Sequence, residues 1–262
     1  MSIMNTKKKD DLIIFGRKPV EEQILNDVRN IDEIIFIHHR GGMSPEIKAM
    51  KKLAVDRKIN VSFIEEKKAE LMLGKVNTQG ILAKIKKFRY RKYNDWIKED
   101  LLKNESNLVL ILDKIEDVGN FGAIIRTAAA AGVSAIFVGE HSQAPINGTV
   151  FKTSAGNALK VNIVNDLNLN RVIEDLQRNK FWVYGIDIDD TREYKAGNIW
   201  EQNFSGNTAI VLGSEGKGIS KKVLEKCDFI TPIPMENGVE SLNVSVAAAI
   251  TIFEWKRQQN NK

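Results

Sequence analysis

The side chains with the clearest chemical potential lie near the end of the chain, in residues 230–250, which read ITPIPMENGVESLNVSVAAAI. Ser241, Asn243 and Ser245 bring three short polar side chains to the head of a small-residue helix. Such residues accept hydrogen bonds from the free backbone N–H groups at a helix start. By residue type alone, this stretch indicates a capped, buried helix after a strand and defines no chemistry.

Two further segments add amide and charged side chains. Residues 113–130, DKIEDVGNFGAIIRTAAA, contain Asn120, which we expect to cap a helix, and Arg126. Because an unpaired guanidinium among isoleucines and alanines would be costly, Arg126 predicts an anionic partner, and an RNA phosphate suits its bidentate geometry. The alternative is an ordinary surface or interface arginine. Residues 210–220, IVLGSEGKGIS, add Glu215.

Glycine-rich turns after strands also suggest nucleotide-binding loops, and the sequence allows two common types to be tested. Gly119 and Gly122 do not have the spacing of a G-x-G-x-x-G dinucleotide turn. Lys217 is followed by Gly218 where a P-loop has serine or threonine, and Val211 stands where that loop needs glycine. Both nucleotide-binding interpretations are therefore disfavoured.

Taken in order, the three segments resemble the signature motifs of the SpoU/TrmH family of RNA ribose 2'-O-methyltransferases, which belong to the trefoil-knotted SPOUT class. The resemblance spans residues 108–257. It implies an enzyme that uses S-adenosylmethionine, without a metal, to methylate a ribose 2'-hydroxyl in RNA. It implies catalytic roles for Asn120, Arg126, Glu215, Ser241 and Asn243, and a cofactor pocket that includes Gly213, Ile233 and Leu242.

The resemblance also makes Arg126 essential, and we expect it to bind phosphate and stabilise charge developing on the ribose oxygen. Because a guanidinium stays protonated, it is a poor base, and a water or a serine would relay the proton. The sequence departs from the family pattern at Val118, where a proline usually precedes the Gly-Asn pair. Since Asn120, Gly122 and Arg126 are present, this change does not predict loss of activity.

The elements that must position these residues alternate between strands and helices from residue 108 onward, which predicts an α/β domain with a parallel sheet. Apolar runs predict strands at residues 108–113, 135–138, 181–186, 209–212 and 229–233. Helical patterns fall at residues 121–131, 169–178 and 219–225, and a last helix begins at Val244. Nothing in this periodicity indicates a knot, which follows from the resemblance alone.

The first third of the chain also alternates and predicts a smaller α/β domain. Strands are expected at residues 12–15, 35–37, 61–64 and 80–85, with helices at 19–25, 45–55 and 65–73. FGRKPVEEQI and TQGILA resemble the L30e-like N-terminal domain that one branch of the family uses to engage RNA. We therefore expect an RNA-binding domain at residues 1–86, a linker at 87–107 and the knotted methyltransferase domain at 108–262.

Charge is distributed unevenly along the chain. Residues 1–93 contain 21 Lys and Arg against 12 Asp and Glu, a net charge of +9, which leaves 18 against 22, a net charge of −4, for the remainder. A polyanion would be drawn to the first third. Within it, KIKKFRYRKY at residues 84–93 interleaves cations with aromatic rings. This stretch predicts either contacts with RNA phosphates and unpaired bases or an edge strand protected by lysines.

A single cysteine, Cys227, excludes an internal disulfide and fits a reducing compartment. The basic start of the chain has no apolar stretch after it, and no run is long enough to span a membrane, so we expect a cytoplasmic protein. Family resemblance and two alanine-rich helix faces predict a homodimer. The favoured substrate is a guanosine of 23S ribosomal RNA; the alternatives are transfer RNA, or a non-catalytic RNA-binding or assembly factor.

Overall fold

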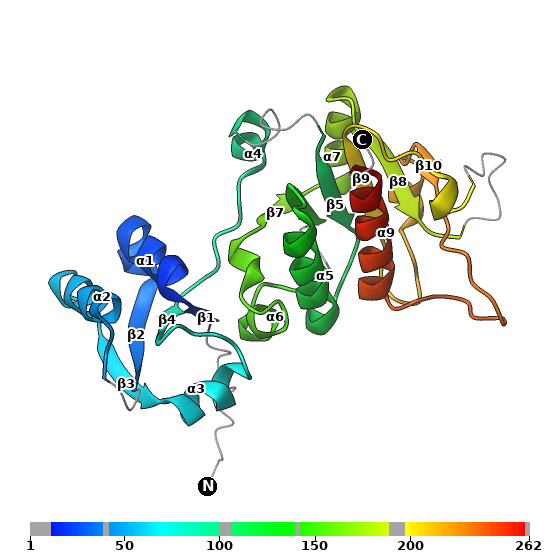
Figure 1. Cartoon of the computed structure of the whole chain (residues 1–262). Helices are drawn as coiled ribbons and strands as arrows, with labels where there is room; N and C mark the ends of the chain where they lie inside the picture. The colour runs from blue at the N-terminus through cyan, green and yellow to red at the C-terminus, as the bar shows by residue number, and fades with distance from the viewer. Residues whose placement is uncertain (1–11, 39–41, 100–105, 140–141, 189–196, 260–262) are drawn as a thin grey trace, which may run out of the picture. The chain divides into compact units, whose positions relative to one another are not determined.

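The computed structural model describes residues 12–38, 42–99, 106–139, 142–188 and 197–259 (Figure 1). The chain divides into two compact units. The first comprises residues 1–89 together with 146–156, and the second comprises residues 90–145 together with 157–262. Residues 100–105 of the predicted linker and the basic start of the chain, residues 1–11, lie outside the described ranges.

The first unit contains the predicted small α/β domain. Its four-stranded sheet has the order β1-β4-β2-β3, with β2 parallel to β3 and antiparallel to β4. The strands are β1 (Leu12–Phe15), β2 (Ile31–His38), β3 (Val61–Glu65) and β4 (Ile81–Ile85). The helices are α1 (Arg17–Asn26), α2 (Pro45–Asp56), α3 (Glu66–Leu73) and α6 (Gly148–Thr153), and a short 3-10 turn, η1, covers Val28–Asn30.

Helix α2 shows how local sequence produces these elements. The Ser44 hydroxyl accepts a hydrogen bond from the Ile47 N–H at 3.4 Å, and Pro45 occupies the first helical position, where its missing N–H costs nothing. Ile47, Met50 and Ala54 recur at helical spacing and are buried. The helix therefore begins at a cap and packs through one apolar stripe.

The second unit is built on six parallel strands in the order β10-β8-β9-β5-β6-β7, which confirms the predicted parallel sheet. They are β5 (Leu108–Leu112), β6 (Ala135–Gly139), β7 (Asn162–Leu167), β8 (Trp182–Ile186), β9 (Thr208–Leu212) and β10 (Phe229–Ile230). Every residue of the central strands β5 and β9 is buried. This is expected where helices cover both faces of a parallel sheet.

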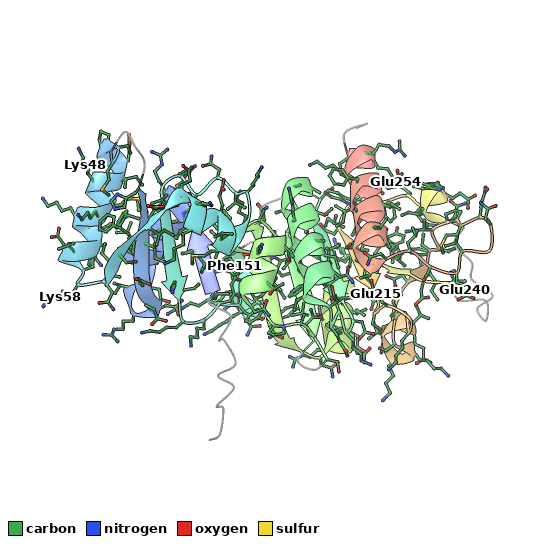
Figure 2. All side chains as sticks on the ribbon, turned by 90° about the horizontal axis from the view of Figure 1, so that it is seen from below. Lys48, Lys58, Phe151, Glu215, Glu240 and Glu254 are labelled. Atoms are coloured by element: carbon green, nitrogen blue, oxygen red, sulfur yellow. The ribbon has the colours of Figure 1, made fainter. Side chains whose placement is uncertain are left out.

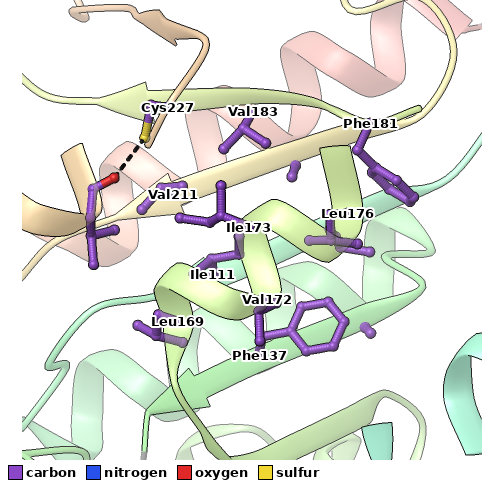
Figure 3. Close-up of a cluster of buried hydrophobic side chains, with 14 of the residues drawn as sticks. Ile111, Phe137, Leu169, Val172, Ile173, Leu176, Phe181, Val183, Val211 and Cys227 are labelled. Atoms are coloured by element: carbon purple, nitrogen blue, oxygen red, sulfur yellow. Dashed lines mark hydrogen bonds between the residues drawn. The ribbon is translucent and has the colours of Figure 1, made fainter. Parts of the chain in front are cut away.

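One face of this sheet is covered by α4 (Tyr93–Glu99), α7 (Leu169–Arg178) and α8 (Lys221–Leu224). Figure 3 shows the apolar core on this side, in which Ile173 and Leu176 of α7 lie over strand residues such as Val183. Cys227 is buried in the same cluster as a small apolar side chain. On the other side, α5 (Val118–Ala131) and α9 (Val244–Gln259) pack against each other (Figure 1).

Several predicted elements have different bounds; the strand expected at residues 35–37, for example, spans Ile31–His38. Helix α5 begins at Val118, because the Asp117 carboxylate caps it by accepting the Asn120 N–H at 2.7 Å; the expectation that Asn120 is the cap was wrong. The strand expected at residues 229–233 pairs only over Phe229–Ile230. Pro232 follows shortly after, and a proline has no N–H to give to a ladder.

Three elements were not anticipated from the sequence: α4, α6 and β7. Strand β7 is the edge strand of its sheet; it pairs with β6 and forms one isolated bridge, between Val164 and Arg91, on its outer side. It therefore tolerates polar residues such as Asn162 and lacks a strong apolar run. The helix predicted at residues 219–225 is reduced to α8. The 3-10 turns η3 (Asn157–Leu159) and η4 (Ile199–Glu201) complete the second unit.

Candidate active site

The segment after β9, residues 213–218, folds into a tight loop. Its first position, Gly213, can only be glycine. The Ser214 N–H donates to the Gly218 carbonyl at 3.1 Å, and the Gly218 N–H donates back to the Ser214 carbonyl at 3.0 Å. A Cβ on Gly213 would lie 2.0 Å from the Gly218 carbonyl carbon, which no side chain could tolerate. The loop therefore exposes backbone groups, with Glu215 near its tip.

Two carboxylates, at the ends of the two strands that flank β9, hold this loop in place. Buried Asp113, just after β5, accepts the Ser220 N–H at 2.7 Å. Asp187, just after β8, accepts the Ile219 N–H at 2.7 Å through one oxygen and the Ile188 N–H at 2.7 Å through the other. Hydrogen bonds from backbone N–H groups to carboxylates are strong. These aspartates therefore serve to position the loop.

Three of the predicted catalytic side chains meet in one hydrogen-bonded cluster. The Asn120 amide donates to Glu215 Oε1 at 2.8 Å, and the Asn243 amide donates to the same oxygen at 2.6 Å. Asn243 Nδ2 also lies 3.0 Å from Asn120 Oδ1. Asn120 comes from the first turn of α5 and Asn243 from the start of α9, so the packing of these two helices brings the cluster together.

Asn243 is fixed on its other side by its role as a helix cap. Its Oδ1 accepts the Ser245 backbone N–H at 3.0 Å and the Ser245 hydroxyl at 2.6 Å. The capping expected from the sequence is therefore present. Because both donors occupy the amide oxygen, the Asn243 NH2 group must face Glu215, and the cap sets the orientation of a candidate catalytic group.

A cavity of about 500 Å³ lies beside the cluster, a size typical of sites for small ligands. It is bounded by the ends of β8 and β9, the glycine-rich loop, and residues 232–235 and 240–247. Of the predicted site residues, its lining includes Gly213, Glu215, Ile233, Ser241, Leu242 and Asn243. Asn120 and Arg126 are outside the lining. Sequence reasoning missed Asp187, Met235 and Glu240, which carry no motif signal of their own.

The charge of the lining suits S-adenosylmethionine, whose sulfonium and ammonium groups are cationic. Asp187, Glu215 and Glu240 line the cavity, and none of its described lining residues is lysine or arginine (Figure 2 labels Glu215 and Glu240). The backbone groups of Gly213 and Ile233, which line the cavity, can hydrogen-bond the edges of a neutral adenosine. In the parts of the chain that the structure describes, no group of three or more His, Cys, Asp or Glu could hold a metal ion.

Arg126 lies in the second half of α5 with an exposed side chain. The prediction that its apolar neighbours surround it was wrong, because Ile124 and Ile125 turn inward and are buried while Arg126 points to solvent. It forms no ion pair with any described residue. The guanidinium is therefore available to an anionic ligand.

The basic and aromatic stretch at residues 84–93 is largely occupied by contacts within the protein. Arg89 pairs with Asp27 at 2.6 Å, and Lys84 lies 3.6 Å from a Glu33 oxygen. In the second unit, Tyr93 packs edge-on against Phe137 at 5.8 Å, and burial raises the pKa of Tyr93 to about 12. These contacts favour a structural role for this stretch.

A parallel sheet with an amide and carboxylate cluster beside an acidic cavity defines a methyltransferase of the class that the three motifs resemble. The chain belongs to the SpoU rRNA Methylase family, whose model matches residues 107–253. A second model, described as RNA 2'-O ribose methyltransferase substrate binding, matches residues 13–91. The protein is accordingly an enzyme that transfers a methyl group from S-adenosylmethionine to a ribose 2'-oxygen of RNA.

Individual relatives are similar over nearly the whole chain. The 23S rRNA (guanosine-2'-O-)-methyltransferase RlmB of Xanthomonas campestris pv. campestris is 35% identical over 96% of this chain and 98% of its own. The SpoU methyltransferase AviRb from Streptomyces viridochromogenes, solved with the cofactor AdoMet, has the same fold, with a TM-score of 0.70, 18% identity and coverage of 97% of this chain and 92% of its own.

A shorter solved relative matches less of the chain. The TrmH/SpoU tRNA modifying enzyme of A. aeolicus is 28% identical with a TM-score of 0.54, and it covers 63% of this chain and 81% of its own. In the described residues of this chain, no helix is long and apolar enough to cross a membrane.

Proposed function

We propose that this enzyme methylates the ribose 2'-oxygen of a guanosine in 23S ribosomal RNA. The 35% identity to RlmB extends over 96% of this chain and therefore includes the substrate-binding unit. The tRNA modifying enzyme covers only 63%. Transfer RNA is the alternative substrate, and the experiment below distinguishes the two.

The observation that carries the proposal is the cluster of Asn120, Glu215 and Asn243 beside the cavity. A non-catalytic RNA-binding factor would not need two amides from different helices converging on one carboxylate oxygen. The cluster fixes the glycine-rich loop relative to α5 and α9. It thereby holds the wall of the cavity rigid where the ribose must approach.

S-adenosylmethionine, when bound, supplies a methyl group on a sulfonium sulfur, and Gly213, Ile233 and Leu242 are the residues that would hold it through backbone and apolar contacts. The chain's task is to present a ribose 2'-oxygen to that methyl group. Arg126 binds a neighbouring phosphate and offsets the negative charge that develops on the ribose oxygen. Because the guanidinium stays protonated, the departing proton leaves through a water or through Ser241.

The proposal includes a homodimer, because Arg126 is exposed and does not line the cavity of its own subunit. The faces of α5 and α9 that point away from the sheet contain small residues, and Val246 and Phe253 of α9 are exposed by 46% and 49%. Apolar side chains exposed on one helix face suit burial against a second copy. Arg126 would then act at the partner's cavity.

Family membership supports three further parts of the proposal. The C-terminal region is threaded as a trefoil knot, the first unit binds RNA while the second binds the cofactor, and the protein works in the cytoplasm, where bacterial ribosomes are assembled. The match of the substrate-binding model to residues 13–91 supports the division of labour.

The direct test is to incubate the enzyme and labelled S-adenosylmethionine with 23S ribosomal RNA from a strain that lacks the protein, and to map the labelled nucleotide. We expect label on the ribose of one guanosine. Transfer RNA from the same strain is the parallel substrate. Label in transfer RNA alone would refute the ribosomal assignment, and no label in any RNA from folded, cofactor-binding protein would refute the activity.

A further inference from the structure

A second cavity, of about 440 Å³, lies within the first compact unit and has no part in the site described above. It opens where the turn after β1, the segment leading into α2 and the loop before β4 meet. Its lining includes Arg17, Ile37, Met43, Ile47, Asn77 and Gln79. Together with Ile37 of β2, four parts of the chain therefore contribute polar and apolar residues to one space.

The two amide side chains in this lining are oriented by the backbone around them. Asn77 Oδ1 accepts the Gln79 N–H at 3.1 Å, and Gln79 Oε1 accepts the Arg17 N–H at 2.9 Å. Each amide oxygen is thus occupied, while the Asn77 and Gln79 NH2 groups have no partner among the described residues. The cavity therefore has two oriented hydrogen-bond donors available to a ligand.

The remaining walls are apolar, since Ile37, Met43 and Ile47 also line the cavity. An apolar wall with donors at its edge suits a flat ring that has hydrogen-bond acceptors on its rim. The bases of unpaired RNA nucleotides have this character and are recognised in such pockets. The substrate-binding model covers residues 13–91, which include the whole lining.

The cationic side chains in and near the lining of this cavity are mostly exposed and weakly paired. Arg17 lies 3.6 Å from Glu46, but both side chains are largely exposed, so the pair contributes little. Lys18 and Lys48, which adjoin the lining residues Arg17 and Ile47 in sequence, form no ion pair with any described residue. These cations are available to RNA phosphates.

We propose that this cavity binds one unpaired nucleotide of the substrate RNA, with the base held by Asn77 and Gln79 and the phosphate by Arg17. The inference rests on the proposed function, in that the ligand is the RNA that the enzyme methylates. It assigns substrate recognition to a definite pocket in the first unit.

The binding test uses full-length protein and protein-free 23S ribosomal RNA, with affinity measured over a range of salt concentrations. Asn77→Ala should weaken RNA binding about tenfold without changing the salt dependence, because it removes contacts to a neutral base. Arg17→Ala should weaken binding and also reduce the slope of log K against log salt by about 0.7, the value of one phosphate contact to a single strand. Affinity for S-adenosylmethionine should be unchanged in both.

Lys58→Ala is the matched control, because Figure 2 shows Lys58 at the opposite end of α2 from Lys48. It should leave RNA affinity nearly unchanged. Equal losses in Asn77→Ala and Lys58→Ala would overturn the pocket, as would normal RNA binding by both pocket variants. If wild-type protein neither binds nor methylates the RNA, the proposed function itself fails; normal methylation together with unaffected pocket variants defeats only the pocket.

Crosslinking provides a second measurement that does not depend on loss of affinity. Met43, which lines the cavity, is replaced by benzoylphenylalanine, and half-exposed Phe63 of β3 is replaced in the same way as a control. On irradiation with the same RNA, the label at position 43 should crosslink at one unpaired nucleotide. Crosslinks confined to position 63, or a position 43 label that crosslinks only within duplex RNA, would overturn the proposal.

Discussion

At the scale of single residues, Glu215 has one carboxylate oxygen engaged by two amides and the other without a partner among the described residues. Two donors on one oxygen restrict rotation of the carboxylate. The residue is thereby oriented by Asn120 and Asn243, and its function depends on both.

We expect Asn243→Asp to reduce methyl transfer by about 10²-fold, a loss typical of removing one preorganised polar group. Aspartate caps a helix as well as asparagine does, so the start of α9 should remain folded. It cannot donate, however, and it would place a second carboxylate where Nδ2 lies 2.6 Å from Glu215 Oε1. Methylation rate and thermal unfolding should be measured together.

Ser245→Ala is the control for that change. It removes one donor to Asn243 Oδ1 but keeps the backbone N–H at 3.0 Å and the Asn243 donor itself. Activity should fall far less than in Asn243→Asp. Equal activity losses in both variants would show that helix capping, and not the donor to Glu215, is what the reaction requires.

At the scale of elements, Val118 is the first residue of α5, a position where proline is favoured because its N–H would have no helical partner. Asp117 has φ −76° and ψ 122°, the extended conformation that a residue before proline adopts. Val118→Pro should therefore increase the free energy of unfolding by about 0.4–1 kcal/mol. The free energies of unfolding of Val118→Pro, Val118→Ala and the wild type should be measured by urea unfolding. A Val118→Pro protein that is less stable than the wild type would contradict the expectation.

The end of α9 depends on Glu254, a buried carboxylate. Its pKa is lowered mainly by hydrogen bonds from Arg257, partly opposed by burial and assisted by Gln258. Gln258 in turn accepts the Phe204 N–H at 2.8 Å, which joins the helix to the segment before β9. Because the carboxylate binds a proton less readily in the folded protein, it stabilises that state above its unfolded pKa of 4.5, and this contribution is lost as pH falls further.

Glu254→Gln should therefore be less stable than the wild type at neutral pH, and the difference should shrink as pH is lowered below 4.5. Unfolding midpoints in denaturant, measured across that range for both proteins, provide the test. A difference that stays constant with pH would show that the charge of Glu254 does not contribute.

At the scale of the whole molecule, the position of Trp96 decides where the two units can be separated. Trp96 is fully buried and lies edge-on to Phe137 at 5.0 Å in the core of the second unit. A fragment of residues 90–262 should keep full affinity for S-adenosylmethionine, while one of residues 108–262 should be less stable because it lacks this ring. Calorimetric titration measures the cofactor affinity of the two fragments, and thermal unfolding measures their stability.

The longer fragment should also lose most RNA affinity and show a weaker dependence on salt, since the phosphate contacts of the first unit are gone. RNA affinity and salt dependence equal to those of the intact chain would contradict the division of labour between the units.

A shared active site can be tested with two inactive variants. Arg126→Ala should bind the cofactor normally and lose methyl transfer by about 10²-fold, because it removes a charge and not the cavity. When Arg126→Ala and Asn243→Ala proteins are mixed under conditions that exchange subunits, heterodimers form. One of the two sites in each heterodimer then has both an intact Arg126 and an intact Asn243, and activity should be recovered at that site. Exchange without recovery would place both residues in one subunit's site, and a fully active monomer would exclude the dimer.

The sequence by itself determined the class of fold and the chemistry. Continuous apolar runs such as residues 108–112 and 208–212 are long enough only for strands buried on both faces, so the parallel sheet followed from local composition. The three motifs were equally local, because each is a short segment whose residue order identifies the family. Capping of α9 by Asn243 belongs to the same category.

The tertiary structure decided which side chains meet. Asn120 and Glu215 are 95 residues apart in sequence, and their contact depends on β5 pairing with β9, which sets the start of α5 beside the loop that follows β9. Arg89 pairs with Asp27 through a contact that no local pattern reveals, and it favours the structural alternative of the two that the sequence left open for residues 84–93. The second cavity could not be predicted from the sequence for the same reason. Its walls come from four parts of the chain, and a cavity exists only once their backbones have been brought together.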